Sequence, residues 1–160
     1  GIRDMHKKIT KIMTVFLLTV TSGLFAFGAS AEPEATAAEP ASLYERLGAW
    51  DGISKVVADT IALHVKNPTI SHYFKDTDLD KLHEHVTAFF AAGTGGPAKY
   101  EGRDMTSAHA AMGMSDEDFQ SAVADVLTAV KMNGLGEQEQ ADVEAILMSL
   151  KPAVMGTGGS

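Results

Sequence analysis

The helical spacing of apolar residues from Ser42 onward is the feature that most restricts the fold of this chain. Leu, Val, Ile, Met and Phe recur at intervals of three and four residues, and no alternation typical of a β-strand persists. The pattern predicts an all-α body of five or six helices over roughly 115 residues, which supply enough apolar side chains for one core.

Capping and breaking signals divide this body. Ser42 to Glu45 has the form of a capping box, and Gly48 is expected to end that short helix. Further helices are predicted over 51–66, from Asp76 or Asp78 to about 92, over 115–132 and over 137–150. The side chains expected to face inward from the second helix are Ile53, Val56, Val57, Thr60, Ile61, His64 and Val65.

Composition excludes several kinds of site. The chain has no cysteine, which rules out disulfides, thiolate-bound metals, iron–sulfur clusters and covalent attachment of a c-type haem. Four of its 13 basic and one of its 21 acidic residues lie in 1–31, so the remainder carries 9 basic and 20 acidic residues, net −11. Such a surface repels phosphate backbones, and we expect no nucleic-acid partner.

The N-terminal region has the pattern of a secretory signal. Met5 and a basic stretch precede the apolar run 12–28, and Ala29-Ser30-Ala31 fits a cleavage site before Glu32. We therefore expect residues 1–31 to act as a signal peptide, with residues 1–4 as extra residues before Met5, and a periplasmic or otherwise exported body. The alternative is an uncleaved membrane anchor. Residues 32–41 are expected to form a disordered leader, and 156–160 a flexible tail.

His109 is the first candidate site residue, and the only histidine within residues 86–160. Its neighbours in 107–111 are small, and Met105, Met112 and Met114 surround them with polarisable apolar bulk. A large flat group could approach this imidazole closely, and haem iron is commonly held by such a histidine. An ordinary core or surface histidine remains the alternative at this point.

The helix predicted to end near 92 carries a second group of candidates. Leu82, Val86, Phe89, Phe90 and Gly93 share one face at helical spacing. His85 lies at the flank of that face, and His83 overlaps its other side. Spacing alone leaves open whether these histidines turn toward the apolar face or remain in solvent.

Several short motifs then follow one another in a characteristic order. They are Ser42-Leu43-Tyr44-Glu45-Arg46-Leu47-Gly48, His72-Tyr73-Phe74, Phe89-Phe90, Gly95-Gly96-Pro97, Tyr100-x-Gly102-Arg103-x-Met105, Ala108-His109, Met112-Gly113-Met114 and Phe119. In order and spacing the stretch 42–155 resembles the group 1 truncated haemoglobins. The resemblance implies a truncated globin domain over 42–155, folded as a two-over-two helical sandwich with non-covalent haem b.

The resemblance also implies roles for individual residues. His109 matches the proximal iron ligand, and Phe74 matches a phenylalanine that packs on the haem. Tyr100 and Met105 match residues at the haem edge and propionate side. The remaining predicted haem contacts are Leu82, Val86 and Phe90 on the distal helix, and Phe119.

Departures from the family pattern concern the distal side. Ile61 stands where the family usually has a tyrosine that hydrogen-bonds iron-bound oxygen, and Thr60 stands where phenylalanine is usual. Leu82 and Val86 replace glutamines, and Ala49 replaces the second glycine of an early Gly-Gly turn. A charge-assisted hydrogen bond contributes roughly 1.5–3 kcal/mol, so its loss should weaken O₂ retention about ten- to a hundredfold.

His85 suggests another use of the iron. It falls where some family members carry a distal histidine that coordinates the haem, so we predict that His109 and His85 both ligate iron. Two imidazoles favour electron transfer. Some bis-histidyl relatives also attach haem covalently to a histidine in the last helix, but residues 110–160 contain none.

The sequence thus predicts an exported haem protein, not an enzyme, that reversibly binds small ligands such as O₂, NO or CO. The alternative is a periplasmic bis-histidyl electron-transfer protein with a redox partner. NO dioxygenase or peroxidase-like activity remains open, although the missing distal tyrosine argues against the former. A globin fold that has lost haem is the remaining alternative.

Overall fold

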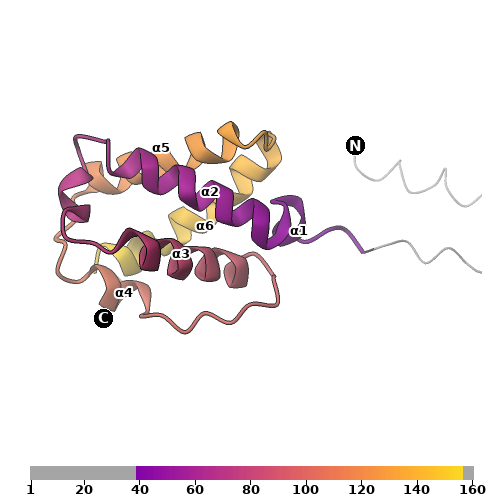
Figure 1. Cartoon of the computed structure of the whole chain (residues 1–160), viewed down its shortest axis with the longest axis horizontal. Helices are drawn as coiled ribbons and strands as arrows, with labels where there is room; N and C mark the ends of the chain where they lie inside the picture. The colour runs from indigo at the N-terminus through magenta and orange to yellow at the C-terminus, as the bar shows by residue number, and fades with distance from the viewer. Residues whose placement is uncertain (1–38, 157–160) are drawn as a thin grey trace, which may run out of the picture. The chain divides into compact units, whose positions relative to one another are not determined.

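The computed structural model describes residues 39–156, and all regular secondary structure within them is helical. Figure 1 shows the arrangement. The elements are α1 Leu43–Arg46, α2 Ala49–His64, the 3-10 helix η1 Ser71–Phe74, α3 Leu79–Gly93, α4 Met105–His109, α5 Asp116–Met132 and α6 Glu137–Val154. The predicted signal peptide, most of the leader and residues 157–160 lie outside the described residues.

The helices form two packed pairs. α2 packs against α3, α5 packs against α6, and α2 also packs against α5, which joins the pairs into a two-over-two sandwich. The short α4 lies against α6. The buried core where these helices meet consists of Leu47, Ile53, Val57, Ile61, Ala91, Val126, Val130 and Val143. The predicted all-α fold is confirmed.

Side-chain caps begin several helices where the sequence predicted them. The Ser42 hydroxyl accepts the backbone N–H of Glu45, and Ser115 makes the equivalent bond with Asp118, each within a capping box. Asp78, one of the two predicted candidates, accepts the N–H of Lys81 at the start of α3. These bonds satisfy backbone donors that have no partner within the first helical turn.

Two helix boundaries differ from the prediction. α2 begins at Ala49 and ends at His64, whereas the range 51–66 was expected from Asp51 and Asn67. α6 continues beyond Leu150 and through Pro152 to Val154. Proline removes one backbone donor and usually ends a helix. Here Val154 lines the central cavity, so burial of apolar surface favours the extra turn.

The turn between α1 and α2 contains Ala49, which stands where the family usually has the second glycine of a Gly-Gly turn. Gly48 has φ +88° and Ala49 has φ +55°, so two consecutive residues are left-handed. Glycine adopts this conformation without steric cost, whereas alanine does not. The turn therefore holds an alanine in a conformation that glycine adopts without strain.

Within 39–156, none of the helices combines the length and apolar character needed to cross a membrane. The apolar run at 12–28, which raised the question of an anchor, lies outside this range.

Candidate functional site

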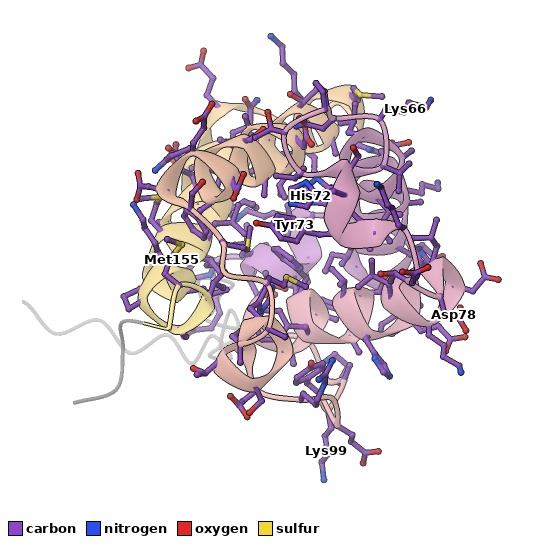
Figure 2. All side chains as sticks on the ribbon, turned by 90° about the vertical axis from the view of Figure 1, so that its left-hand side faces the viewer. Lys66, His72, Tyr73, Asp78, Lys99 and Met155 are labelled. Carbon is purple, nitrogen blue, oxygen red and sulfur yellow. The ribbon has the colours of Figure 1, made fainter. Side chains whose placement is uncertain are left out.

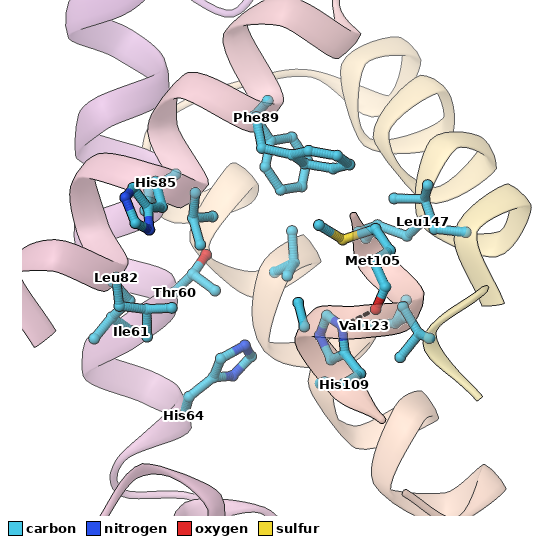
Figure 3. A pocket seen from close by; sticks show the side chains of 18 of the residues that line it. Thr60, Ile61, His64, Leu82, His85, Phe89, Met105, His109, Val123 and Leu147 are labelled. Atoms are coloured by element: carbon cyan, nitrogen blue, oxygen red, sulfur yellow. Dashed lines mark hydrogen bonds between the residues drawn. The ribbon is translucent and has the colours of Figure 1, made fainter. Parts of the chain in front are cut away.

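A cavity of about 470 Å³ lies within the helical sandwich. Figure 3 shows side chains from several helices converging on it, including Leu82 and Phe89 from α3, Val123 from α5 and Leu147 from α6. Most lining residues are apolar, and the polar ones are few. Pockets of this size and character suit a largely apolar small molecule or cofactor.

His109 is fixed at the cavity wall by its own short helix. Asp104 caps α4 by accepting the backbone N–H of Ser107 at 2.9 Å, and His109 is the last residue of that helix. Its Nδ1 donates to the carbonyl oxygen of Met105 at 2.7 Å, the bond drawn in Figure 3. With Nδ1 as donor, Nε2 carries the lone pair, which is the form of histidine that binds a metal.

The conformation around His109 differs from the expected turn of small residues. The five residues 105–109 form a helix, so the backbone carbonyl of Met105 lies one turn before the imidazole. The hydrogen bond to that carbonyl depends on this helical geometry. It orients the ring toward the cavity, which His109 lines together with Met112 and Met114.

All other residues predicted from the resemblance also line the cavity. Tyr100 is held in place by donating its hydroxyl to the carbonyl of Arg103 at 2.7 Å, and its ring meets Phe89 edge-on at 5.1 Å. Arg103 itself is exposed and reaches the lining. The remaining members of the predicted set found on the lining are Phe74, Leu82, Val86, Phe90, Met105 and Phe119.

The two histidines of α3 turn to different sides. His85 lines the cavity while remaining exposed, so it lies at the rim (Figure 3). His83 turns toward α2, where its Nε2 lies 2.9 Å from the carbonyl oxygen of Ser54. Only His85 therefore joins the candidate site.

His64 is a polar residue of the site for which no functional role was predicted. It is the last residue of α2, and its ring projects into the cavity in Figure 3. Its Nδ1 lies 2.9 Å from Oδ2 of Asp125 on α5, and its ring stacks on Phe74 with centroids 5.4 Å apart. Burial lowers the pKa of His64, although the hydrogen bond to Asp125 opposes this shift. Sequence spacing had already placed His64 on the inward face of its helix.

A second polar contact ties η1 to α5. The Tyr73 hydroxyl donates to Oδ2 of Asp118 at 2.8 Å. Figure 2 shows Tyr73 directed into the fold, whereas Lys66 and Lys99 extend outward. Burial raises the pKa of Tyr73, and the hydrogen bond to Asp118 adds to the effect. The contact positions η1, which also carries Phe74, at one end of the cavity.

Known proteins have sequences similar to that of this chain. The group 1 truncated haemoglobin GlbN of Synechocystis sp. is 32% identical over 109 residues, which cover 66% of this chain and 88% of that protein. The group 1 truncated haemoglobin LI410 of Chlamydomonas moewusii is 30% identical over 125 residues, which cover 77% of this chain and 73% of that protein.

Solved structures give the same result for the fold. Chlamydomonas reinhardtii THB1 superposes with a TM-score of 0.62 at 28% identity, covering 74% of this chain and all of that one. The truncated haemoglobin of Tetrahymena pyriformis in its Fe(III) form gives a TM-score of 0.67 at 24% identity, covering 72% and 97%. The bacterial-like globin family matches residues 42–155. Because this match spans more than half of the chain and agrees with these relatives, the chain belongs to the bacterial-like globins, as a group 1 truncated haemoglobin.

Proposed function

We propose that this globin binds one haem b in its central cavity, with Nε2 of His109 as the iron ligand. The observation that carries the proposal is the hydrogen bond from His109 Nδ1 to the Met105 carbonyl, which leaves Nε2 with its lone pair at the wall of a largely apolar cavity. Bound haem supplies an iron that takes a small ligand such as O₂, NO or CO.

The other lining residues fit such a group. Apolar walls favour burial of the porphyrin and exclude water, and Phe74 and Phe90 offer aromatic surface for it. The exposed cation of Arg103 at the cavity lining suits the carboxylates that haem carries. Covalent attachment through cysteine, or through a histidine within residues 110–160, is not available, which supports non-covalent binding.

Titration of the full chain with haem, followed by visible absorption, tests this proposal. We expect saturation at about one haem per chain, as one cavity with one proximal histidine requires. His72→Gln should give the same titration curve as the wild type, because His72 is exposed and lies outside the cavity lining. Absorption that rises without a saturation point, as for haem adsorbed on a surface, would contradict the proposal.

Coordination by His85 is the finer part of the proposal, and it would favour electron transfer as the second candidate function. Its support is the position of His85 on the rim of the cavity that His109 also lines. Spectra of wild-type protein and His85→Ala in both oxidation states test it. Low-spin bands in both states that become high-spin in the variant would support two histidine ligands. A high-spin ferrous spectrum that the substitution does not change would leave an open ligand-binding site.

Location outside the cytoplasm is a further part of the proposal, and it rests on the pattern of residues 5–31. Expression of the full chain in bacteria, followed by fractionation and N-terminal sequencing, tests it. We expect the protein in the periplasmic fraction with Glu32 as its first residue. A cytoplasmic protein that keeps residues 5–31 would overturn this part alone.

A further inference from the structure

The histidine at the end of α2 forms a buried polar group that the family resemblance does not account for. The side chains of His64 and Asp125 are 13% and 17% exposed, so both are largely removed from water. A buried polar pair in an otherwise apolar wall is costly unless every partner is satisfied. What each of the two ring nitrogens does therefore determines the chemistry of this group.

The hydrogen bonds around Asn67 determine which atom donates. The backbone N–H of Thr69 donates to Oδ1 of Asn67 at 3.1 Å, which identifies that atom as the carbonyl oxygen of the amide. The amide nitrogen then donates to Oδ2 of Asp125 and to the Ser121 hydroxyl, both at 2.9 Å. The Asp125 carboxylate is thus held as an acceptor on the side facing His64.

This arrangement fixes the tautomer of His64. The Asp125 carboxylate can only accept, so Nδ1 of His64 carries the proton of the 2.9 Å bond. Nε2 then has a lone pair, and no hydrogen bond within residues 39–156 uses it. Burial lowers the pKa of His64, so the free ring is neutral at neutral pH and its Nε2 is open to accept a proton. The Asp125 carboxylate at Nδ1, together with an anion at Nε2, would offset the cost of burying the imidazolium.

The other ionisable groups on the cavity lining leave this role to His64. Tyr73 on η1 is engaged with Asp118 and has a raised pKa. His109 on α4 has its Nδ1 bonded to Met105, and its Nε2 is assigned to iron. Tyr100 donates its hydroxyl to the carbonyl of Arg103. His85 on α3 and Arg103 line the cavity as exposed residues at its edge.

We propose that His64, oriented by Asp125, is the proton acceptor for weak-acid ligands that enter this cavity and bind the haem iron as anions. The inference rests on the proposed haem binding. When an acid HX enters, the bond between hydrogen and X would break and Nε2 of His64 would take the proton, while Nδ1–H stays bonded to Asp125. Haem held by His109 would supply the iron that takes the anion X⁻. The ligand class is small protic acids such as hydrogen cyanide and hydrogen peroxide.

Counting the protons released when cyanide binds the ferric holoprotein is the test. Hydrogen cyanide is undissociated at neutral pH, so a ligand that binds as the anion must leave its proton somewhere. Calorimetry in buffers of different ionisation enthalpy measures whether solvent receives it. All variants carry His85→Ala, so that release of His85 does not limit binding. We expect about zero protons released in this parent and about one after His64→Leu, with cyanide association slowed at least ~100-fold.

Two further variants keep the test decisive if His64→Leu folds poorly. Asp125→Asn retains the shape of the side chain and removes the negative charge, so proton release should rise toward one and association should slow. His72→Gln, an exposed histidine outside the cavity lining, should match the parent. Carbon monoxide carries no proton, so its association with the ferrous protein should change much less than that of cyanide.

The results distinguish a failure of the proposed role of His64 from a failure of the proposed haem binding. Release of about one proton by the parent, unchanged in His64→Leu, would overturn the role of His64 while leaving haem binding intact. A chain that takes up no haem is detected by its absorption before cyanide is added, and it would overturn both proposals.

Discussion

Ala49 has an unfavourable backbone conformation at a position where the family usually has glycine. Its φ of +55° places an alanine in the left-handed region, next to Gly48 at +88°. A residue with a Cβ is disfavoured there by about 1 kcal/mol.

We therefore expect Ala49→Gly to increase the free energy of unfolding by about 1 kcal/mol, because glycine adopts this φ without strain. Urea unfolding of the wild type and the variant at equal haem occupancy measures the change. The control is Ala58→Gly, at an exposed position within α2. It should decrease stability by roughly 0.5–1 kcal/mol. Equal destabilisation by both substitutions would show that the φ of Ala49 carries no strain.

His64 makes stability depend on pH in a definite direction. Burial lowers its pKa in the folded chain below the value of about 6.5 that an unfolded chain shows. As pH falls from about 6.5 toward the lowered pKa, the unfolded chain gains a proton that the folded chain does not hold, so stability is lost. Above about pH 6.5 both forms are neutral and this contribution is fully present.

His64→Gln isolates this effect, since other groups titrate equally in both proteins. We expect the unfolding free energy of the variant to decline less than that of the wild type between about pH 7 and about pH 5. Parallel curves over this range would mean that the pKa of His64 is the same in the folded and unfolded chains.

At the scale of elements, the starts of α1, α3 and α5 were predictable, whereas the predicted cap Asp51 lies inside α2. Ser42 and Asp78 were predicted as caps, and each accepts a backbone N–H of its first helical turn. The start near Ser115 was predicted from the acidic residues that follow it, and the structure adds a capping box there. α4 was expected as a turn, because five residues with mostly small side chains contain too little periodicity to indicate a helix. Asp104 caps this helix, but an aspartate before so short a segment is not enough to predict a helix there.

The candidate site was only partly predictable from the sequence. The positions of His109 and His85 followed from the family resemblance and from helical spacing, and both lie on the cavity lining. The pairing of His64 with Asp125 joins residues 61 positions apart. Such a contact depends on how α2 packs against α5, which periodicity within either helix does not determine.

The capping box of α5 gives a prediction for an element. Ser115→Ala removes the acceptor for the Asp118 backbone N–H, which should reduce stability by about 1 kcal/mol. Because Asp118 also accepts the Tyr73 hydroxyl, the loss should loosen η1 near the cavity. Ser149→Ala, within α6 and exposed, is the matched control and should be nearly neutral. Hydrogen exchange of residues 71–74 should rise in Ser115→Ala only; equal exchange in both variants would contradict this coupling.

At the scale of the whole molecule, the cavity occupies the region between the two helical pairs that a filled core would otherwise take. A ligand that binds there stabilises the folded chain in proportion to its affinity. With free haem at about 100 times its dissociation constant, the gain is about 2.7 kcal/mol. We expect removal of haem to lower the thermal midpoint of the full chain by several degrees, measured by circular dichroism. Equal midpoints with and without haem would show that the cavity does not bind it.

The central claim is that Nε2 of His109 holds the iron, and His109→Gly with added imidazole tests it most directly. Glycine removes the ligand and leaves space in which free imidazole can take its place. The substitution is made together with His85→Ala, so that His85 cannot take the place of the lost ligand. We predict that this variant loses the absorption bands of histidine-ligated haem, and that millimolar imidazole, on the order of a weak ligand's affinity, restores them. Unchanged bands in His109→Gly without imidazole would contradict the claim, because another residue would then be the iron ligand.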